Sequence, residues 1–176
     1  KRQRNLLDFS DMEQFALRIL TEEKEGKLVP SAVAQEYQER FEEVMIDEYQ
    51  DSNLVQETIL TSVSRESAGQ NNLFMVGDVK QSIYRWRGGD WTILGFIEKG
   101  LPNIKNIDTV SLVNNFRSKQ VIVNFNNAFF QSSVNELDKL NKESEYDSSG
   151  LVNYIYNDVV QVSNDKSGEG YVRVSL

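Results

Sequence analysis

The chain has 176 residues, of which 39% are hydrophobic and 26% charged, so it is long enough for one domain with a real core or for a piece of a larger one. It contains no cysteine and no histidine, which excludes disulfides, cysteine-ligated zinc and the usual general base, and leaves carboxylates, lysines and water for any chemistry. The formal net charge of −8 argues against a protein that coats nucleic acid through bulk positive charge, although it allows a local basic groove.

Two helices are predicted before the first strand. Ser10 and Glu13 have the spacing of a capping box, and apolar residues follow them at helical spacing for about three turns. Residues 26–30, which include a glycine and a proline, break this helix. Ser31 is expected to cap a second helix. The buried stripe of that helix is predicted to be Val33, Ala34, Tyr37 and Phe41.

Two short apolar runs predict neighbouring buried strands. Residues 44–46 end abruptly at Asp47 and Glu48, as a buried parallel strand does when it delivers acidic side chains at its carboxyl end. Residues 73–76 form the second run and stop at Gly77. A helix beginning near residue 53 is predicted between them.

The rest of the chain continues the alternation of strands and helices. Its predicted elements are a helix at 92–97, a turn at 102–106, a strand at 109–113, a helix at 120–130, a weak helix or mobile connector at 132–149, and strands at 151–156 and 171–176. This order predicts an α/β domain around a mainly parallel sheet flanked by helices.

The acid pair after the first strand is a candidate metal and water site. Asp47 is suited to hold a hydrated Mg²⁺, and Glu48 is suited to orient or deprotonate a water molecule. Taken alone, such a pair more often only solvates the end of a strand. Asp51 fits a helix cap as well as it fits a ligand, because an apolar-periodic helix follows it.

Three stretches together resemble motifs II, III and IV of superfamily-one DNA helicases of the UvrD/Rep kind. They are "VMIDEYQDSN" at 44–53, "GDVKQSIYRWR" at 77–87 and "NNFRS" at 114–118. The second stretch, with Lys80, is most similar to the AddA and RecB branch, the motor subunits of helicase-nuclease machines, whereas "RWRGGD" resembles the UvrD and PcrA form. The resemblance covers about residues 6–130.

The resemblance implies a nucleotide site for Mg²⁺ and ATP. Asp47 would hold the metal ion and Glu48 would act as the general base, so both are candidate catalytic residues. Gln81 would sense the γ-phosphate, and Arg117 would reach the same phosphate with a fork that suits phosphoryl oxygens. Lys80 is left without a role, because it departs from the UvrD form.

The resemblance also implies contact with single-stranded DNA. Tyr84, Trp86 and Arg87 would face the strand, and Trp86 is the best candidate for stacking on a base. The alternative for Trp86 is packing in a core or against a neighbouring domain. Arg87 and Arg85 could instead be solvated or paired with the surplus acid, and for Arg85 the two interpretations are equally supported.

The fold implied is a partial RecA-like domain of the P-loop NTPase class. Residues 1–108 would be the later part of the first motor domain and residues 109–176 the start of the second. A phosphate-cradling sequence and its strand are absent, since the one Gly-Lys pair, at Gly26 and Lys27, lacks the earlier glycine. The chain is therefore expected to be a fragment of an ATP-dependent helicase of repair and recombination, inactive by itself.

The expected partners are single-stranded DNA, ATP and a second helicase-nuclease subunit. Unpaired sheet edges would also allow the isolated chain to dimerise. No apolar run approaches a membrane span and no signal-peptide core follows the first residues, so a cytoplasmic setting is expected.

Two other functions compete with the motor. Asp47, Asp78 and Lys80 imitate the acids and lysine of a metal-dependent nuclease, although that interpretation does not account for the second and third stretches. A non-catalytic interaction module would also account for the missing phosphate loop.

Overall fold

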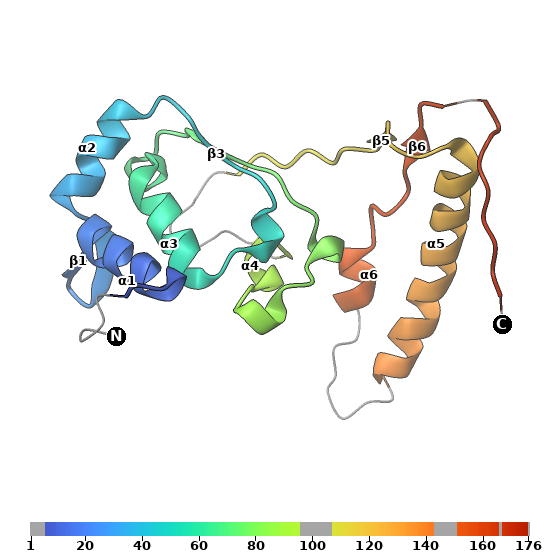
Figure 1. Cartoon of the computed structure of the whole chain (residues 1–176), viewed down its shortest axis with the longest axis horizontal. Helices are drawn as coiled ribbons and strands as arrows, with labels where there is room; N and C mark the ends of the chain where they lie inside the picture. The colour runs from blue at the N-terminus through green and yellow to red at the C-terminus, as the bar shows by residue number, and fades with distance from the viewer. Residues whose placement is uncertain (1–5, 96–106, 143–150, 166, 176) are drawn as a thin grey trace. The chain divides into compact units, whose positions relative to one another are not determined.

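The computed structural model describes residues 6–95, 107–142, 151–165 and 167–175. The chain divides into two compact units, Lys1–Asp108 and Thr109–Leu176, and each is described by itself. Figure 1 shows the helices and strands of both units. The assignment of these units to two motor domains stays a prediction, and the turn predicted at 102–106 lies outside the described residues.

Helix α1, Phe9–Leu20, begins earlier than predicted. Its N-cap is Asp8, whose carboxylate accepts a hydrogen bond from the N–H of Asp11 over 2.9 Å. The carboxylate of Asp11 in turn accepts from the N–H of Asp8 over 3.1 Å. The capping box predicted at Ser10 and Glu13 is therefore wrong, because Asp8 and Asp11 provide the same reciprocal pair two residues earlier.

An antiparallel hairpin follows α1, where only a break in the helix was predicted. Strand β1, Thr21–Lys24, pairs with β2, Lys27–Pro30. The connecting residues Glu25 and Gly26 both have a left-handed backbone, with φ angles of 52° and 76°. Two successive residues of this kind make the tight turn that matches the twist of paired strands. The hairpin was missed because its strands are short and mostly polar.

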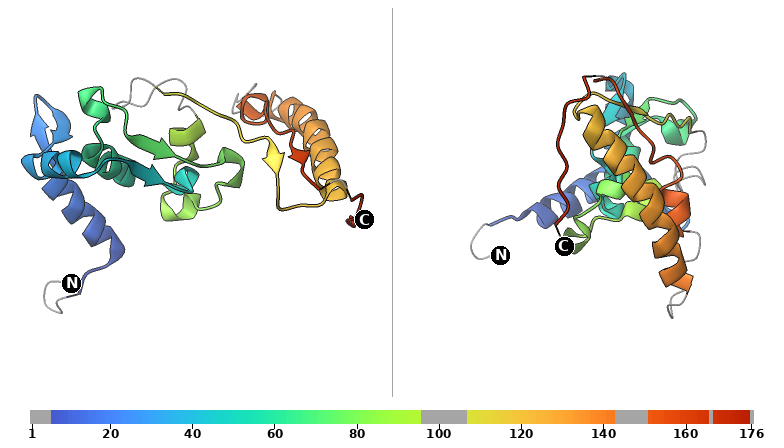
Figure 2. Two further views of the ribbon diagram at one scale, coloured as in Figure 1. Left: turned by 90° about the horizontal axis from the view of Figure 1, so that it is seen from above. Right: turned by 90° about the vertical axis from the view of Figure 1, so that its right-hand side faces the viewer.

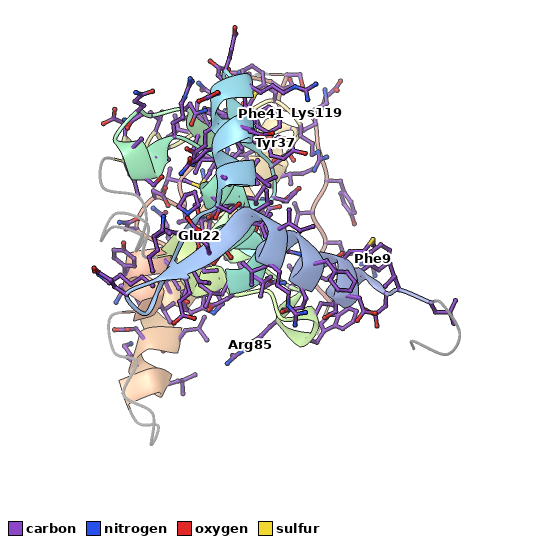
Figure 3. All side chains as sticks on the ribbon, turned by 90° about the vertical axis from the view of Figure 1, so that its left-hand side faces the viewer. Phe9, Glu22, Tyr37, Phe41, Arg85 and Lys119 are labelled. Carbon is purple, nitrogen blue, oxygen red and sulfur yellow. The ribbon has the colours of Figure 1, made fainter. Side chains whose placement is uncertain are left out.

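Helix α2, Ala32–Arg40, is capped by Ser31 as predicted, since the Ser31 hydroxyl accepts from the N–H of Ala34 over 3.2 Å. Of the predicted buried stripe, only Ala34 is fully buried. Tyr37 lies beside Phe41, with ring centroids 5.4 Å apart, and is partly open to solvent (Figure 3). The predicted stripe is therefore largely wrong.

Helix α3, Leu54–Val63, is capped by Asn53 and not by Asp51. The side chain of Asn53 accepts from the N–H of Gln56, and the Oε1 of Gln56 accepts from the N–H of Asn53. The Nε2 of Gln56 also donates to Glu13 of α1 over 2.7 Å. The buried residues of α3 are Glu57, Thr61 and Ser62. Helices α1, α2 and α3 pack against one another (Figure 1).

The predicted pairing of these neighbouring strands is confirmed, but their predicted burial is wrong, because Met45 and Phe74 are 69% and 60% exposed. Strand β3, Val44–Ile46, pairs in parallel with β4, Leu73–Met75, in the register Ile46 to Met75. Figure 2 shows the two arrows side by side. Among the described strands each has one neighbour, so the outer edges are unpaired, and dimerisation through them stays a prediction. Helix α4, Trp91–Gly95, follows as predicted within the described residues.

The second unit is built around one long helix. Its elements are β5 (Asn114–Asn115), α5 (Gln120–Lys142), α6 (Leu151–Ile155) and β6 (Val162–Ser163). Strands β5 and β6 pair in parallel, and α6 packs on α5. Helix α5 contains the predicted helix at 120–130 and extends into the region predicted as a weak helix or connector.

Three predicted strands of this unit are wrong. Residues 109–113 are irregular and exposed, residues 171–175 are irregular, and residues 151–155 form helix α6. A short apolar run does not by itself distinguish a buried strand from a helical turn. The α/β class holds, but the described strands form three separate two-stranded sheets.

Within the described ranges, no helix combines the length and the apolar character needed to cross a bilayer.

Candidate functional site

The parallel strands β3 and β4 end at the same edge of their sheet. The backbone pairing continues beyond them, since the N–H of Val76 donates to the carbonyl oxygen of Ile46 over 2.8 Å and the N–H of Tyr49 donates to that of Val76 over 3.0 Å. The residues that follow β3, Asp47 and Glu48, therefore lie beside those that follow β4. Ligand sites of α/β proteins are commonly found at such strand ends.

The backbone of Glu48 is left-handed, with φ 52° and ψ 41°. A residue with a side chain rarely adopts this conformation, and holding it costs on the order of 1–3 kcal/mol. It turns the chain into the short 3-10 helix η2, Tyr49–Asp51. The N–H of Glu48 donates to the Oδ1 of Asp47 over 2.9 Å. Both acidic residues are exposed, so their carboxylates remain accessible to a ligand.

Gln50 belongs to this site but was not predicted from the sequence. It is only 1% exposed. Its Nε2 donates to the Oε2 of Glu48 over 2.6 Å, and its Oε1 accepts from the N–H of Asp78 over 3.0 Å. Its backbone carbonyl accepts from the hydroxyl of Ser82 over 3.1 Å. Glutamine side chains are mostly exposed in proteins, so only the place of Gln50 two residues after the acid pair could have drawn attention to it.

The chain after β4 forms a compact turn around Asp78, here called the Asp78 turn (residues 78–82). It contains the 3-10 helix η4, Val79–Gln81, which Asp78 caps by accepting from the N–H of Lys80 over 3.0 Å. The Nζ of Lys80 lies 2.9 Å from the Oδ1 of Asp78, and the Nε2 of Gln81 donates to its Oδ2 over 3.1 Å. Burial raises the pKa of Asp78. The hydrogen bonds from Lys80 and Gln81, together with the positive charge of Lys80, lower it by more, so the pKa of Asp78 is below its usual range.

This geometry does not favour the nuclease alternative. Both carboxylate oxygens of Asp78 are engaged with Lys80 and Gln81. Among the described residues there is also no group of three or more acidic, histidine or cysteine side chains placed to hold a metal ion.

The residues after the Asp78 turn form what we call the aromatic loop (residues 83–89). It includes the 3-10 helix η5, Arg85–Arg87. The rings of Tyr84 and Trp86 are tilted with centroids 6.2 Å apart, and the guanidinium of Arg87 lies 5.7 Å from each centroid. Trp86 is 78% exposed, so it is not part of the core of this unit. Figure 3 shows Arg85 projecting away from the ribbon.

Both ends of the aromatic loop are fixed to the region of η2. Immediately before the loop, Ser82 donates to the carbonyl oxygen of Gln50. Immediately after it, the N–H of Asp90 donates to the carbonyl oxygen of Ser52 over 3.0 Å. Gly89 is buried here, and a Cβ on it would lie 3.1 Å from the carbonyl oxygen of Tyr84 and 3.2 Å from that of Asp51. The loop thus starts and ends on the chain that follows the acid pair.

A phenol on η2 and a carboxyl group on α3 are buried in the first unit. Tyr49 is fully buried and Glu57 is 2% exposed. The hydroxyl of Tyr49 and the Oε1 of Glu57 have no hydrogen-bond partner among the described residues. Burial raises the pKa of Glu57. Burial, and then the nearby charge of Glu57, raise the pKa of the Tyr49 phenol.

Arg117 lies in the second unit, on a turn between β5 and α5. The Oδ1 of Asn115 accepts from the N–H groups of Arg117 and Ser118 over 3.0 Å and 2.8 Å, which fixes the backbone of this turn. The Nδ2 of Asn115 donates to the Oε1 of Gln161 over 2.7 Å. Arg117 itself is exposed. The structure thus brings Asp47, Glu48 and the chain that carries Gln81 together in the first unit. Contact of Gln81 and Arg117 with the same phosphate group stays a prediction.

Sequence comparisons identify relatives of the chain. The family model of the UvrD/REP helicase N-terminal domain matches residues 1–102. The A subunits of the ATP-dependent helicase/nuclease from Bacillus cereus (strain AH187), Bacillus thuringiensis (strain Al Hakam) and Bacillus anthracis are each 45% identical to it over 142 residues. The match covers 77% of this chain but 11% of each relative, so the chain spans a small part of their length.

The family model covers more than half of the chain, and the residues that it covers include β3, β4, the acid pair and the aromatic loop. The chain belongs to the UvrD/REP helicase family, through the N-terminal domain of that family.

Proposed function

We propose that this chain is part of an ATP-dependent DNA helicase that moves along single-stranded DNA in repair and recombination, coupling hydrolysis of Mg-ATP to strand movement. The observation that supports this most is the arrangement around η2. The acid pair precedes η2, the Asp78 turn is hydrogen-bonded to it through Gln50, and the aromatic loop returns to the residue after it. A motor protein must couple ATP hydrolysis to DNA binding. The turn at η2 is shared by the residues proposed for these two functions, so it can couple them.

The acid pair has the chemistry of a magnesium and water site. Within the residues that the structure describes, Oδ1 is the one carboxylate oxygen of Asp47 that takes part in a hydrogen bond, so this exposed carboxylate is accessible to a hard cation. Mg²⁺ usually binds one or two carboxylates beside phosphates and water, so one such carboxylate fits. Bound there, the ion would neutralise charge on the phosphate oxygens. Glu48 would accept the proton of the attacking water with the oxygen that Gln50 does not hold.

Gln81 and Arg117 are the proposed phosphate contacts. The amide of Gln81 can donate and accept, and its Nε2 already bonds a carboxylate oxygen, so contact with a phosphate would exchange one anionic partner for another. Arg117 is proposed to reach the same phosphate, because its planar fork matches phosphoryl oxygens better than a point charge does.

The aromatic loop is the proposed contact with DNA. The exposed indole of Trp86 offers a face on which a base can stack, an interaction worth about 1–3 kcal/mol per base. Arg87 lies over both rings and can approach a DNA phosphate from there. The ring of Tyr84 lies beside the indole, with the two centroids 6.2 Å apart, and is proposed to face the strand with it.

The remaining proposals concern the whole protein. Residues 1–108 would be the later part of a first RecA-like domain and residues 109–176 the start of a second. No phosphate-loop sequence occurs in these 176 residues, so the chain alone is expected not to hydrolyse ATP. The relatives are named as subunits of a helicase/nuclease, which supports a partner in the form of a second subunit. A cytoplasmic setting is proposed as well.

The test is DNA-stimulated ATP hydrolysis by the full-length protein with Glu48→Gln. The substitution keeps the hydrogen-bonding shape but removes the base, so we expect kcat to fall at least about a hundredfold while nucleotide binding persists. Glu43→Gln is the matched control, because Glu43 is an exposed acid at the opposite end of β3 and should not affect turnover. Normal hydrolysis by the Glu48 variant would refute the proposed base.

A further inference from the structure

The side chain of Gln50 uses both ends of its amide. The NH₂ group bonds the carboxylate of Glu48 and the carbonyl oxygen bonds the N–H of Asp78, over 2.6 Å and 3.0 Å. Glu48 follows β3 and Asp78 follows β4, so one buried amide spans the ends of both strands. A neutral amide is suited to this place, because its NH₂ group donates to the carboxylate while its carbonyl oxygen accepts from the backbone N–H.

Gln50 also holds the Asp78 turn at both of its ends. Its Oε1 takes the N–H of Asp78 at the start, and its backbone carbonyl takes the hydroxyl of Ser82 at the end. Gln81 lies between these two points, in η4. The position of the Gln81 backbone is therefore tied to that of Gln50.

The side chain of Gln50 has little room to move. A Cβ on Gly77 would lie 2.7 Å from its Oε1, so the backbone at the end of β4 passes directly against the amide. The residue is almost fully buried, and a buried amide that loses its partners costs about 1–3 kcal/mol per group. Rotation away from Glu48 and Asp78 would leave both ends of the amide without hydrogen bonds.

We propose that Gln50 is a positioning residue that holds the Glu48 carboxylate and the Gln81 turn in one fixed relation, so that a displacement of either is passed to the other. This inference rests on the proposed function of Glu48 and Gln81. We assign Gln50 no contact with the reacting atoms. Its role is to orient the base and to connect it, through Ser82, to the start of the aromatic loop.

The test compares Gln50→Met with Gln56→Met in the full-length protein. Methionine keeps the approximate volume but removes both side-chain hydrogen bonds. Gln56 is a close match, because its Nε2 also donates to a carboxylate, that of Glu13, and its Oε1 also accepts from a backbone N–H, that of Asn53. The measurements are kcat and KM for ATP, nucleotide affinity, and hydrogen exchange of the backbone amides of residues 78–82.

For Gln50→Met we expect kcat to fall between about tenfold and about a hundredfold, nucleotide affinity to stay within about threefold, and the amides of residues 78–82 to exchange faster. Gln56→Met should leave all three near the starting values. Unchanged turnover with Gln50→Met, or an equal loss with Gln56→Met, would overturn the inference.

A second variant covers the case in which Gln50→Met does not fold. Ser82→Ala removes one hydrogen bond at the end of the Asp78 turn and leaves the Gln50 side chain in place. It should raise exchange at residues 78–82 and reduce the stimulation of ATP hydrolysis by DNA, and no change in either measurement would refute the coupling. If Glu48→Gln abolishes turnover while Gln50→Met does not, the inference about Gln50 fails alone. If Glu48→Gln leaves turnover unchanged, the proposed function of Glu48 is refuted, whatever Gln50→Met shows.

Discussion

The N–H of Asp90 donates to the carbonyl oxygen of Ser52 over 3.0 Å, and this bond returns the aromatic loop to the chain that carries the acid pair. The loop leaves the same region at Ser82, which is bonded to Gln50. A displacement of η2 would therefore move both ends of the loop together. These two hydrogen bonds tie the loop that carries Trp86 to the turn that follows Glu48, although the two residues are far apart in sequence.

Replacing Trp86 with alanine is expected to weaken binding of single-stranded DNA by about 1–3 kcal/mol, which is about 5-fold to 150-fold in affinity, because a stacking face is lost. Fluorescence anisotropy of a labelled oligonucleotide with the full-length protein measures this. Phe9→Ala is the control, since Phe9 is another large aromatic residue with the same exposed fraction of 78%, on α1. Equal affinities of the two variants would remove Trp86 from the DNA-binding surface.

Replacing Glu57 with glutamine is expected to stabilise the protein at neutral pH. Burial raises the folded-state pKa of Glu57 above its ordinary 4.5, so the contribution of this group to stability is fully present below pH 4.5 and is lost as the pH rises through the folded-state pKa. At pH 7 the variant should gain about 1 kcal/mol, since no buried charge must be kept, and the gain should shrink toward pH 4.

Urea denaturation at both pH values checks the Glu57 prediction. Glu36→Gln on α2 is the control, because Glu36 is exposed and should show no such pH-dependent gain. A loss of stability at pH 7 in the Glu57 variant would mean that its charged form is stabilised in the fold.

Replacing Gly77 with alanine is expected to destabilise the protein by about 1–3 kcal/mol. The new methyl group would lie 2.7 Å from the Oε1 of Gln50 and 2.7 Å from the Cδ2 of Leu94, so both side chains, or the backbone at residue 77, must move. Urea denaturation measures the change, with Ser67→Ala on an exposed turn as the control. Wild-type stability of the Gly77 variant would show that the Gln50 amide is not held against this backbone.

The parallel strands and the positions of their acidic ends could be predicted from the sequence because their signal is local. Three apolar residues followed at once by Asp47 and Glu48 are typical of a buried strand that ends at a polar edge, and the second run ends at a glycine that the backbone of the site requires. The cap at Ser31 was predicted because it depends on a side chain next to the helix that it caps. For α3, Asp51 fitted a cap on the sequence alone, whereas the cap is Asn53.

The parts that were missed depend on contacts between distant residues. The amide of Gln50 acquires its partners only when β4 lies beside β3, and Asp78 is 28 positions along the chain. In the second unit, the apolar run at 151–155 became a helix because it packs on α5, which no local pattern reveals. Leu112 is 79% exposed although its apolar neighbours predict a strand, and nothing in the described part of its unit covers it.

The left-handed backbone at Glu48 has an evolutionary consequence. Glycine would adopt that conformation with no steric penalty, so selection for folding alone would favour glycine there. A carboxylic acid is present instead, and the fold carries the strain through the hydrogen bonds of its neighbours. Thermostable variants chosen only for resistance to heat should therefore lose this acid early, and with it the chemistry that the position supplies.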